Sequence, residues 1–314
     1  YSVGKKIGKL RKGDFVLDIG ANDGTMLKFF KSSGIKTIGC EPAKNLTKEL
    51  SKNCDITMDN FWSIENFNKL RQKFKFKKPK LITAIGMFYD LEDPSKFIKD
   101  INLALHDDGI FIAQLMCLKS MIEKNDLGNI CHEHLEYYSY KSLIYLFEKN
   151  GFQIIKVEEN EINSGSYRIY CKKKTAPSIK YKEKTNLIET KKFISRVINI
   201  KSKCYSFIKR ETEKGKTVFV YGASTKGNTI LQFFKLDKNL IPYAAERSPQ
   251  KWGKYTVGTG IKIISEDKAR MLKPDYFLVL PVAFIKEFIK REKKWLDGGG
   301  KFIVPFPKFK IISK

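Results

Sequence analysis

Short apolar runs alternate with helical stretches along the first half of the chain. Residues 15–19, 36–40, 80–85 and 110–114 are apolar enough for buried strands, and residues 25–31, 44–51, 64–74 and 94–105 carry apolar side chains at helical spacing. A helix between two strands brings the chain back to the end of the sheet at which the first strand began, so the two strands run parallel. This alternation therefore predicts a parallel sheet with helices on both faces. Residues 152–158 and 167–171 are expected to add two closing strands.

The same alternation resumes in the last third of the chain. Residues 172–185 are rich in Lys and contain Pro177, which indicates a linker, and apolar residues at helical spacing then predict one long amphipathic helix to about residue 210. Strands are expected at 217–221, 241–245, 261–264, 276–280 and 302–304, with helices at 228–234, 267–271 and 285–295. The pattern therefore predicts an α/β protein with domains at 1–172 and 216–314, joined by a linker and helix at 173–215.

Composition narrows the class of protein. The 314 residues include 60 Lys and Arg, of which only eight are Arg, and the net charge is +26. Lysines spread evenly along a chain are typical of a solvated surface, whereas nucleic-acid interfaces concentrate Arg with aromatic residues, so we expect no nucleic-acid partner. No run of about 18 apolar residues or apolar leader is present, and the six cysteines are scattered without a CxxC pair. We therefore expect a cytoplasmic protein with reduced thiols and no membrane span.

A glycine-rich loop with two carboxylates follows the first predicted strand. The sequence from Asp18 to Gly24 has the spacing GxxxG instead of the GxGxxG of dinucleotide-binding enzymes, and it includes Asp23. Carboxylates repel phosphate but suit a cationic amino-acid group or the hydroxyls of a ribose. Glu41 ends the next strand, 21 residues after Gly20, which is about the spacing at which an acid reaches a ribose in this topology.

Two of the three histidines lie together in the sequence His132-Glu133-His134. Three interpretations are open: a metal site, a structural pair of histidines, or general acid–base chemistry. A metal site needs a third or fourth ligand; Glu133 is expected on the opposite face and the remaining histidine is remote, so we predict no metal. Acid–base chemistry is favoured because imidazole titrates near neutral pH and a neighbouring carboxylate can tune it.

A second glycine turn follows the strand predicted at 217–221. The sequence Gly222-Ala-Ser-Thr-Lys-Gly-Asn228 lacks the spacing of a P-loop, but it places two hydroxyls and a Lys at the start of a helix. Such a helix start favours a phosphate, although a plain turn without a ligand is the alternative.

These motifs together resemble a known family. The Asp18–Gly24 loop and Glu41 resemble motif I and the ribose-binding acid of class I S-adenosylmethionine-dependent methyltransferases. The sequence from Cys131 to Ser139 (CHEHLEYYS) and the sequence from Asn163 to Arg168 (NSGSYR) resemble the nucleotide-sugar C-methyltransferases, which act on keto-deoxysugars. The resemblance implies a Rossmann-like methyltransferase domain, a linking helix and a second Rossmann-like α/β domain. It also implies S-adenosylmethionine as cofactor, bound by Asp18, Gly20, Asn22, Gly24, Glu41, Asp59, Thr83 and Ala84.

The resemblance extends to roles in catalysis and substrate binding. His134 matches the proposed base, with Glu133 beside it, and His132, Tyr137 and Tyr138 are secondary candidates for contact with the sugar. The C-terminal domain would hold the nucleotide diphosphate of the substrate through Ser224, Thr225, Lys226, Asn228, Glu246, Arg247, Lys251 and Thr259. The chain departs from its relatives at Cys131 (Tyr in the best-known members), at Glu246 (Asp in relatives) and at Val282-Ala283 (often Trp-His). It also lacks the cysteine-rich zinc module that relatives carry at the N-terminus.

The implied reaction is methylation of carbon. A base removes a proton beside a ketone, and the resulting enolate attacks the sulfonium methyl group. The expected partner is a nucleotide-diphosphate sugar, bound by a monomer or homodimer. O-methylation of a sugar or small anion is the alternative enzyme activity, because a hydroxyl also needs a base. An RNA-associated module and a nicotinamide oxidoreductase rank lower, since the sequence has neither Asn-Pro-Pro-Tyr after the fourth strand nor GxGxxG in the second half.

Overall fold

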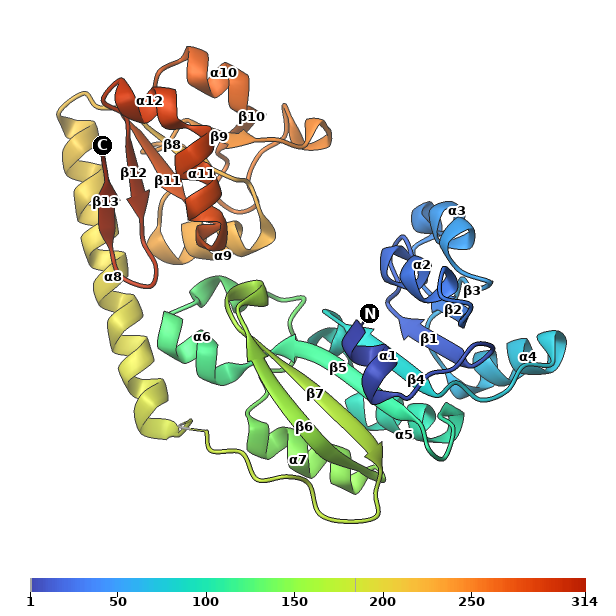
Figure 1. Cartoon of the computed structure of the whole chain (residues 1–314). Helices are drawn as coiled ribbons and strands as arrows, with labels where there is room; N and C mark the ends of the chain where they lie inside the picture. Colours follow the sequence, from blue (N-terminus) through green and yellow to red (C-terminus); the bar gives the residue numbers. More distant parts are fainter. Residues whose placement is uncertain (1, 184) are drawn as a thin grey trace. The chain divides into compact units, whose positions relative to one another are not determined.

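The computed structural model describes residues 2–183 and 185–314 (Figure 1). The chain divides into two compact units, one formed by Tyr1–Leu118 with Leu135–Glu183 and the other by Lys119–His134 with Lys184–Lys314. Residues 119–134, which the sequence pattern assigns to the N-terminal domain, therefore group with the C-terminal part of the chain. Each unit contains its own mixed β-sheet, as the sequence predicts.

The first unit is built on a seven-stranded sheet in the order β3-β2-β1-β4-β5-β7-β6. All neighbouring strands are parallel except at β7, which runs antiparallel to both β5 and β6. The strands are β1 (Phe15–Ile19), β2 (Lys36–Cys40), β3 (Ile56–Met58), β4 (Leu81–Ile85), β5 (Ile110–Met116), β6 (Phe152–Asn160) and β7 (Ser166–Lys173). The helices are α1 (Ser2–Ile7), α2 (Thr25–Lys31), α3 (Lys44–Asn53), α4 (Ile64–Phe74), α5 (Pro94–Ala104) and α7 (Tyr140–Lys149), and short 3-10 turns lie at η1 (Phe88–Asp90) and η3 (Ile162–Ser164).

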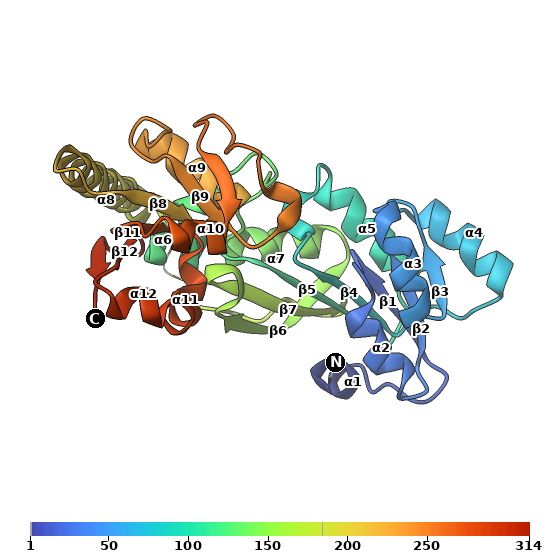
Figure 2. The same cartoon turned by 90° about the horizontal axis from the view of Figure 1, so that it is seen from above.

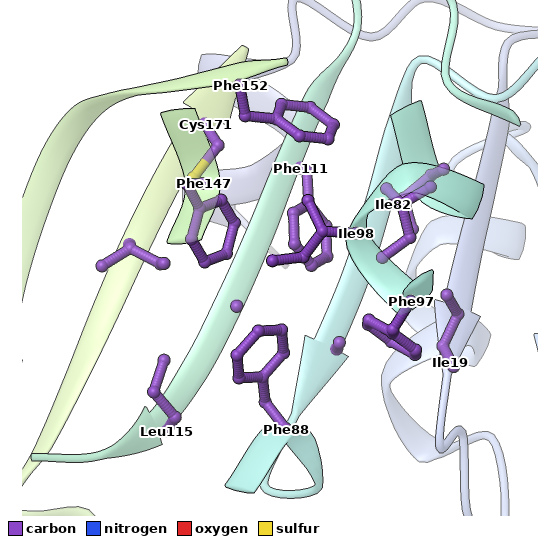
Figure 3. Close-up of a cluster of buried hydrophobic side chains, with 14 of the residues drawn as sticks. Ile19, Ile82, Phe88, Phe97, Ile98, Phe111, Leu115, Phe147, Phe152 and Cys171 are labelled. Carbon is purple, nitrogen blue, oxygen red and sulfur yellow. The ribbon is translucent and has the colours of Figure 1, made fainter. Parts of the chain in front are cut away.

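Alternating side chains along the central strands build two separate cores. On β1, Val16 packs into one core and Leu17 into the other, and Leu81 and Ile82 divide in the same way on β4. Period-two alternation places successive side chains on opposite faces, so strands that are apolar throughout must be covered on both sides. In the larger core, Phe111 of β5 stacks on Phe147 of α7 at 5.9 Å between ring centroids (Figure 3). Burial of one such side chain contributes about 2–3 kcal/mol.

The second unit contains a six-stranded sheet in the order β10-β9-β8-β11-β12-β13. Its strands are β8 (Val218–Tyr221), β9 (Tyr243–Glu246), β10 (Lys262–Ser265), β11 (Tyr276–Val279), β12 (Lys301–Val304) and the antiparallel β13 (Lys310–Ile312). The helices are α6 (Leu118–Lys124), α8 (Leu187–Glu213), α9 (Thr225–Phe234), α10 (Glu266–Met271), α11 (Ile285–Arg291) and α12 (Lys293–Asp297), with 3-10 turns at η2 (Leu127–Asn129), η4 (Pro249–Lys251) and η5 (Val282–Phe284). The two sheets share the strand order 3-2-1-4-5, counted within each sheet. Figure 2 shows this order in the first sheet, from β3 to β5.

One predicted helix is interrupted in the structure, and two short strands were not predicted from the sequence. The helix expected at 285–295 is broken at Glu292, whose buried carboxylate accepts hydrogen bonds from Tyr221 and Arg270. The strand β3 has only three residues, too short to show a period. The antiparallel β13 has only three residues as well. In the described part of the chain, none of the helices combines the length and apolar character that crossing a membrane requires.

Candidate active site

The loop between β1 and α2 turns on two glycines. Gly20 and Gly24 have φ values of 73° and 78°, a conformation that side chains with a Cβ rarely adopt. The Gly20 and Ala21 N–H groups both donate to the Cys40 carbonyl, at 2.9 and 3.0 Å. At Gly24 a Cβ would also lie 2.9 Å from Leu50 Cδ1. The loop is therefore fixed against the end of β2 and the side of α3.

Glu41 holds this loop through its carboxylate. Its Oε2 accepts the Asn22 N–H and its Oε1 accepts the Ala43 N–H, each at 3.0 Å. The side chain is half-buried. Each carboxylate oxygen can accept more than one hydrogen bond, so one backbone N–H per oxygen leaves room for further donors such as ribose hydroxyls.

Asp18 lies beneath the loop and is almost completely buried. It accepts a 2.6 Å hydrogen bond from Thr83 Oγ1 of β4. Burial raises the pKa of the Asp18 carboxyl to about 7, because the charged form loses solvation; the nearby charge of Glu41 adds to this rise and the Thr83 hydrogen bond opposes it. A buried carboxyl with such a pKa favours a cationic ligand.

The other sequence-predicted cofactor residues occupy different environments. The Thr83 hydroxyl donates its hydrogen bond to Asp18. The side chain of Ala84 is fully buried in the larger core, so only its backbone could contact a cofactor. Asp59 is exposed after β3 and lines a cavity of about 200 Å³ together with residues of α4.

The carboxylates and the space at the ends of β1 and β4 fit S-adenosylmethionine. A Cβ at Gly86 would meet nothing within 4 Å, and one at Gly20 would meet only the Met87 side chain. The carboxylates of Asp18 and Glu41 suit its ammonium and sulfonium charges and its ribose hydroxyls. Within the described residues, no cluster of three or more His, Cys, Asp or Glu side chains could hold a metal ion.

His134 lies in a tight turn of the second unit. Its N–H donates to the Cys131 carbonyl at 3.1 Å, so residues 131–134 form a turn and the two imidazoles do not share the face of an extended strand. His134 is half-buried, and its Nδ1 lies 2.9 Å from the Asn129 carbonyl oxygen. A carbonyl oxygen only accepts, so Nδ1 carries the hydrogen and the basic lone pair is on Nε2. Sequence reasoning missed Asn129, since a backbone carbonyl leaves no signal in the residue type.

The two residues before His134 in the chain are an exposed histidine and an ionised glutamate. The His132 side chain is 91% exposed, and its Nδ1 lies 3.5 Å from Glu133. The pKa of Glu133 is lowered by hydrogen bonds that its carboxylate accepts from its own backbone N–H and from the Cys131 thiol. The charges of the adjacent histidines lower it further. Glu133 is therefore an ionised carboxylate next to His134 in the chain, and Cys131 supplies the hydrogen-bond donor where relatives have Tyr.

Tertiary contacts within the second unit anchor the segment 119–134. Arg196 of α8 donates to Asn125 Oδ1 at 2.8 Å and to the Ile122 carbonyl at 2.7 Å, and Asn125 Nδ2 donates to the Pro307 carbonyl. At Gly128 a Cβ would lie 3.1 Å from Lys226 Cβ, so η2 packs closely on α9. These contacts hold the turn that presents His134.

Within the first unit, the chain resumes beside the end of β4. The Leu135 and Glu136 N–H groups both donate to the Tyr89 carbonyl, at 3.0 and 3.1 Å. Tyr138 is buried with its ring 5.4 Å from that of Phe88. Its hydroxyl has no hydrogen-bond partner among the described residues, and burial raises its pKa. A buried hydroxyl without a partner is energetically costly. Tyr137 is half-buried.

The glycine turn after β8 has the same kinds of hydrogen bond as the glycine turn after β1. Gly222 has a φ of 92° and donates to the Ala245 carbonyl, and the Ser224 hydroxyl caps α9 by accepting the Gly227 N–H. Glu246 accepts the Ala223 and Ser248 N–H groups, both at 3.0 Å. The remaining predicted residues in the first turn of α9 are the exposed Thr225 and the half-buried Lys226 and Asn228.

Two further residues that are predicted to bind the substrate, Arg247 and Thr259, differ in exposure. Arg247 is exposed and approaches Glu287 at 3.9 Å. Thr259 is buried, and its hydroxyl lies 2.7 Å from that of Thr256. The structure therefore gives Thr259 a role in holding its own loop. Lys251 Nζ donates to the Ala223 carbonyl at 2.8 Å.

Comparisons with known proteins cover both halves of the chain. A family model described as a methyltransferase domain matches residues 4–157, and one described as a C-methyltransferase C-terminal domain matches residues 161–307. C-methyltransferase NovU of Streptomyces niveus is 27% identical over an alignment of 321 positions, which covers 98% of this chain and 76% of that protein.

Solved structures also resemble part of the chain. A TehB-like methyltransferase from Corynebacterium glutamicum is 14% identical, with a TM-score of 0.39 over 55% of this chain and 87% of that one. Magnesium protoporphyrin IX methyltransferase from Synechocystis with bound S-adenosylmethionine is 12% identical, with a TM-score of 0.41 over 55% of this chain and 77% of that one. The two family models together span residues 4–307, and the chain is an S-adenosylmethionine-dependent methyltransferase whose C-terminal half matches the C-methyltransferase model.

Proposed function

We propose that this C-methyltransferase methylates a carbon next to the ketone of a nucleotide-linked keto-deoxysugar, with His134 as the base. The observation that carries the proposal is the hydrogen bond between His134 Nδ1 and the Asn129 carbonyl, because it leaves the basic lone pair on Nε2. The ionised Glu133 beside it stabilises the imidazolium that forms once the ring accepts a proton.

The position of His134 in the chain supports the same role. Its peptide bond joins it to Leu135, and consecutive Cα atoms are about 3.8 Å apart. Leu135 donates to the Tyr89 carbonyl just after β4. The carboxyl ends of parallel strands are where open α/β sheets bind ligands, so the position of Leu135 next to His134 in the chain supports the role of His134 as the base.

The chain's residues would act in a defined order. His134 Nε2 takes the proton from the carbon beside the ketone, and the electron pair of the broken C–H bond forms an enolate. Tyr138 is proposed to donate its unpartnered hydroxyl to the enolate oxygen. When bound, S-adenosylmethionine would supply an electrophilic methyl group; the enolate carbon would bond to that methyl group, and the electron pair of the broken C–S bond would stay on sulfur.

The cofactor is proposed to be held by the loop after β1. Glu41 would accept the ribose hydroxyls, while Asp18 and Gly20 would lie beside the methionine portion, with Asn22 and Gly24 shaping the loop. Asp59 would lie near the adenine. The unfavourable burial of Asp18 in its ionised form would be relieved by the positive charges of the bound cofactor.

Two variants of the base and one matched control test the proposal. His134→Ala and His134→Gln are expected to reduce methyl transfer at least 100-fold, the usual contribution of a general base being about 10²–10⁴-fold, while S-adenosylmethionine binds with unchanged affinity. His106→Ala removes the third histidine, whose Nδ1 accepts the Asp108 N–H in the turn before β5, and is expected to retain most activity. Transfer is measured with radiolabelled cofactor on a panel of nucleotide-linked keto-deoxysugars, and binding by calorimetry. Wild-type turnover in His134→Ala would exclude this base.

Deuterium exchange distinguishes methylation of carbon from methylation of oxygen. If His134 forms an enolate, the wild-type enzyme in D₂O should exchange the C–H next to the ketone without cofactor, and His134→Ala should not. Methylation of a hydroxyl needs no such exchange. If the carbon next to the ketone takes up no deuterium and the product carries its new methyl group on oxygen, the proposed function is contradicted.

A further inference from the structure

A cavity of about 530 Å³ lies at the amino ends of β11 and β12 in the second unit. Pro274 and Asp275, which line it, directly precede β11, and Gly300 directly precedes β12. The glycine turn after β8 follows the carboxyl end of a strand parallel to these two, so the cavity lies at the opposite edge of this sheet. Its volume is in the range of small-molecule sites, and the proposed reaction does not use it.

The two carboxylates that line the cavity already have cationic partners. Glu292 is buried, and its Oε2 accepts a 2.9 Å hydrogen bond from Arg270 Nε. Asp275 Oδ1 accepts a hydrogen bond from Lys216 Nζ at 3.0 Å, and its Oδ2 accepts the Thr217 N–H at 2.9 Å. Neither carboxylate therefore needs a cation from a ligand.

Two of the four cationic side chains at the cavity have no such partner. The guanidinium groups of Arg270 and Arg291 approach Glu266 at 2.9 and 3.2 Å. Lys273 and Lys294 are exposed, and their ammonium groups make no ion pair or hydrogen bond within the part of the chain that the structure describes. With four cations and two carboxylates, the lining carries a net charge of +2. The cavity therefore suits an anion, which would be the partner of both lysines.

The indole of Trp295 forms a fixed wall of the cavity. Its Nε1 donates to the Pro274 carbonyl at 2.9 Å, and a Cβ at Gly300 would collide with the ring. Because its N–H is already used, the indole offers only ring surface to a ligand. A Cβ at Gly299 would meet nothing within 4 Å, so the loop before β12 leaves space beside this wall.

We propose that this cavity binds a phosphomonoester that carries a planar ring, such as a nucleoside monophosphate. A phosphomonoester has a charge of about −1.5 to −2 at neutral pH, which matches the net charge of the lining. Lys273, just after α10, and Lys294, in α12, would contact its oxygens, since Lys binds phosphate as a point charge. The planar ring would pack on the indole of Trp295.

Calorimetry on the full chain tests the proposal with the 5′-monophosphates of uridine, cytidine, guanosine and adenosine. S-adenosylhomocysteine is kept saturating so that the cofactor site of the first unit does not bind them. At least one monophosphate should bind with a dissociation constant below about 1 mM. It should bind at least about 5-fold more tightly than its uncharged nucleoside, inorganic phosphate or glucose 1-phosphate, which lack either the charge or the planar ring.

Variants of the two lysines assign the binding to the cavity. Lys273→Gln and Lys294→Gln should each weaken it about 5-fold, because a charged hydrogen bond gives about 10-fold where it is shielded and less at an exposed side chain. Lys262→Gln is the matched control: it removes an exposed lysine at the start of β10, outside the cavity, and should change the affinity less than 2-fold. Melting temperatures check that the variants stay folded.

Hydrogen exchange locates the bound monophosphate on the wild-type protein. Residues 270–275 and 294–301, which surround the cavity, should become protected, and residues 222–228 of the glycine turn should not. This measurement depends on no variant and involves no methyl transfer, so the proposed function and this proposal fail separately.

Several outcomes would overturn the proposal. One is the absence of monophosphate binding at millimolar concentration, and another is protection at residues 222–228 alone. Equal weakening by Lys262→Gln would show general attraction to a chain with a net charge of +26 and no site at the cavity. Equal affinity for glucose 1-phosphate would contradict the packing of a planar ring on Trp295.

Discussion

Replacement of Asp18 by Asn is expected to stabilise the cofactor-free protein near neutral pH and to weaken cofactor binding. The carboxyl is almost completely buried between β1 and β4, where it accepts a hydrogen bond from the Thr83 hydroxyl. Glu41 and the Cys40 thiol are the other titratable groups that face it. An amide of the same shape can keep the Thr83 contact and removes the buried charge.

The magnitude follows from the pKa of Asp18, which burial raises from 3.8 to about 7. Below pH 3.8 the carboxyl is protonated in both folded and unfolded protein, so it contributes no pH dependence. Between pH 3.8 and about 7 the unfolded chain ionises first, and the folded protein loses about 1.4 kcal/mol of stability per pH unit. The total loss is at most about 4 kcal/mol and is complete above pH 7.

The assay compares wild-type protein and Asp18→Asn in urea at several pH values from 4 to 8.5, without cofactor. Hydrogen exchange of the β1 and β4 peptides identifies the transition of the first unit, because two units can unfold separately. The stability difference in favour of the variant should grow as the pH rises to 7 and then stay constant. Calorimetry should show weaker binding of S-adenosylmethionine by the variant above pH 7. Stability curves that remain parallel at all pH values would refute the assignment of a buried, protonated Asp18.

Two further variants test contacts that only the tertiary structure shows. Arg196→Ala removes the donor to Asn125 and to the Ile122 carbonyl, so it should lower the kcat of methyl transfer about 10-fold or more through misplacement of His134, while the dissociation constant of S-adenosylmethionine stays unchanged. Equal losses in both quantities would indicate general damage to the fold. Glu292→Gln leaves Arg270 without its buried partner and should lower the free energy of unfolding of the second unit by about 3 kcal/mol, measured in urea; a loss below 1 kcal/mol would contradict this role.

The cofactor loop could be predicted from the sequence because its structure is local. The strand at 15–19 and the helix at 25–31 have the predicted bounds, since apolar period and glycine positions are set by residues only a few places apart. The spacing from Gly20 to Glu41 follows from the same strand–helix–strand unit. The prediction of S-adenosylmethionine as cofactor, made from the resemblance of this loop, is confirmed by the family models.

The surroundings of the proposed base were not predictable from the sequence. Residues 119–134 follow β5 in the chain, but Arg196 and the close approach of Gly128 to Lys226 place them in the second unit. The hydrogen bond that selects the tautomer of His134 comes from a backbone carbonyl, which any residue could supply. The sequence by itself determined the elements, the cofactor loop and the family motifs, because these depend on neighbours along the chain. The tertiary structure decided which elements hold His134 and where the predicted helix breaks at Glu292, because those outcomes depend on partners about 70 residues away in the sequence.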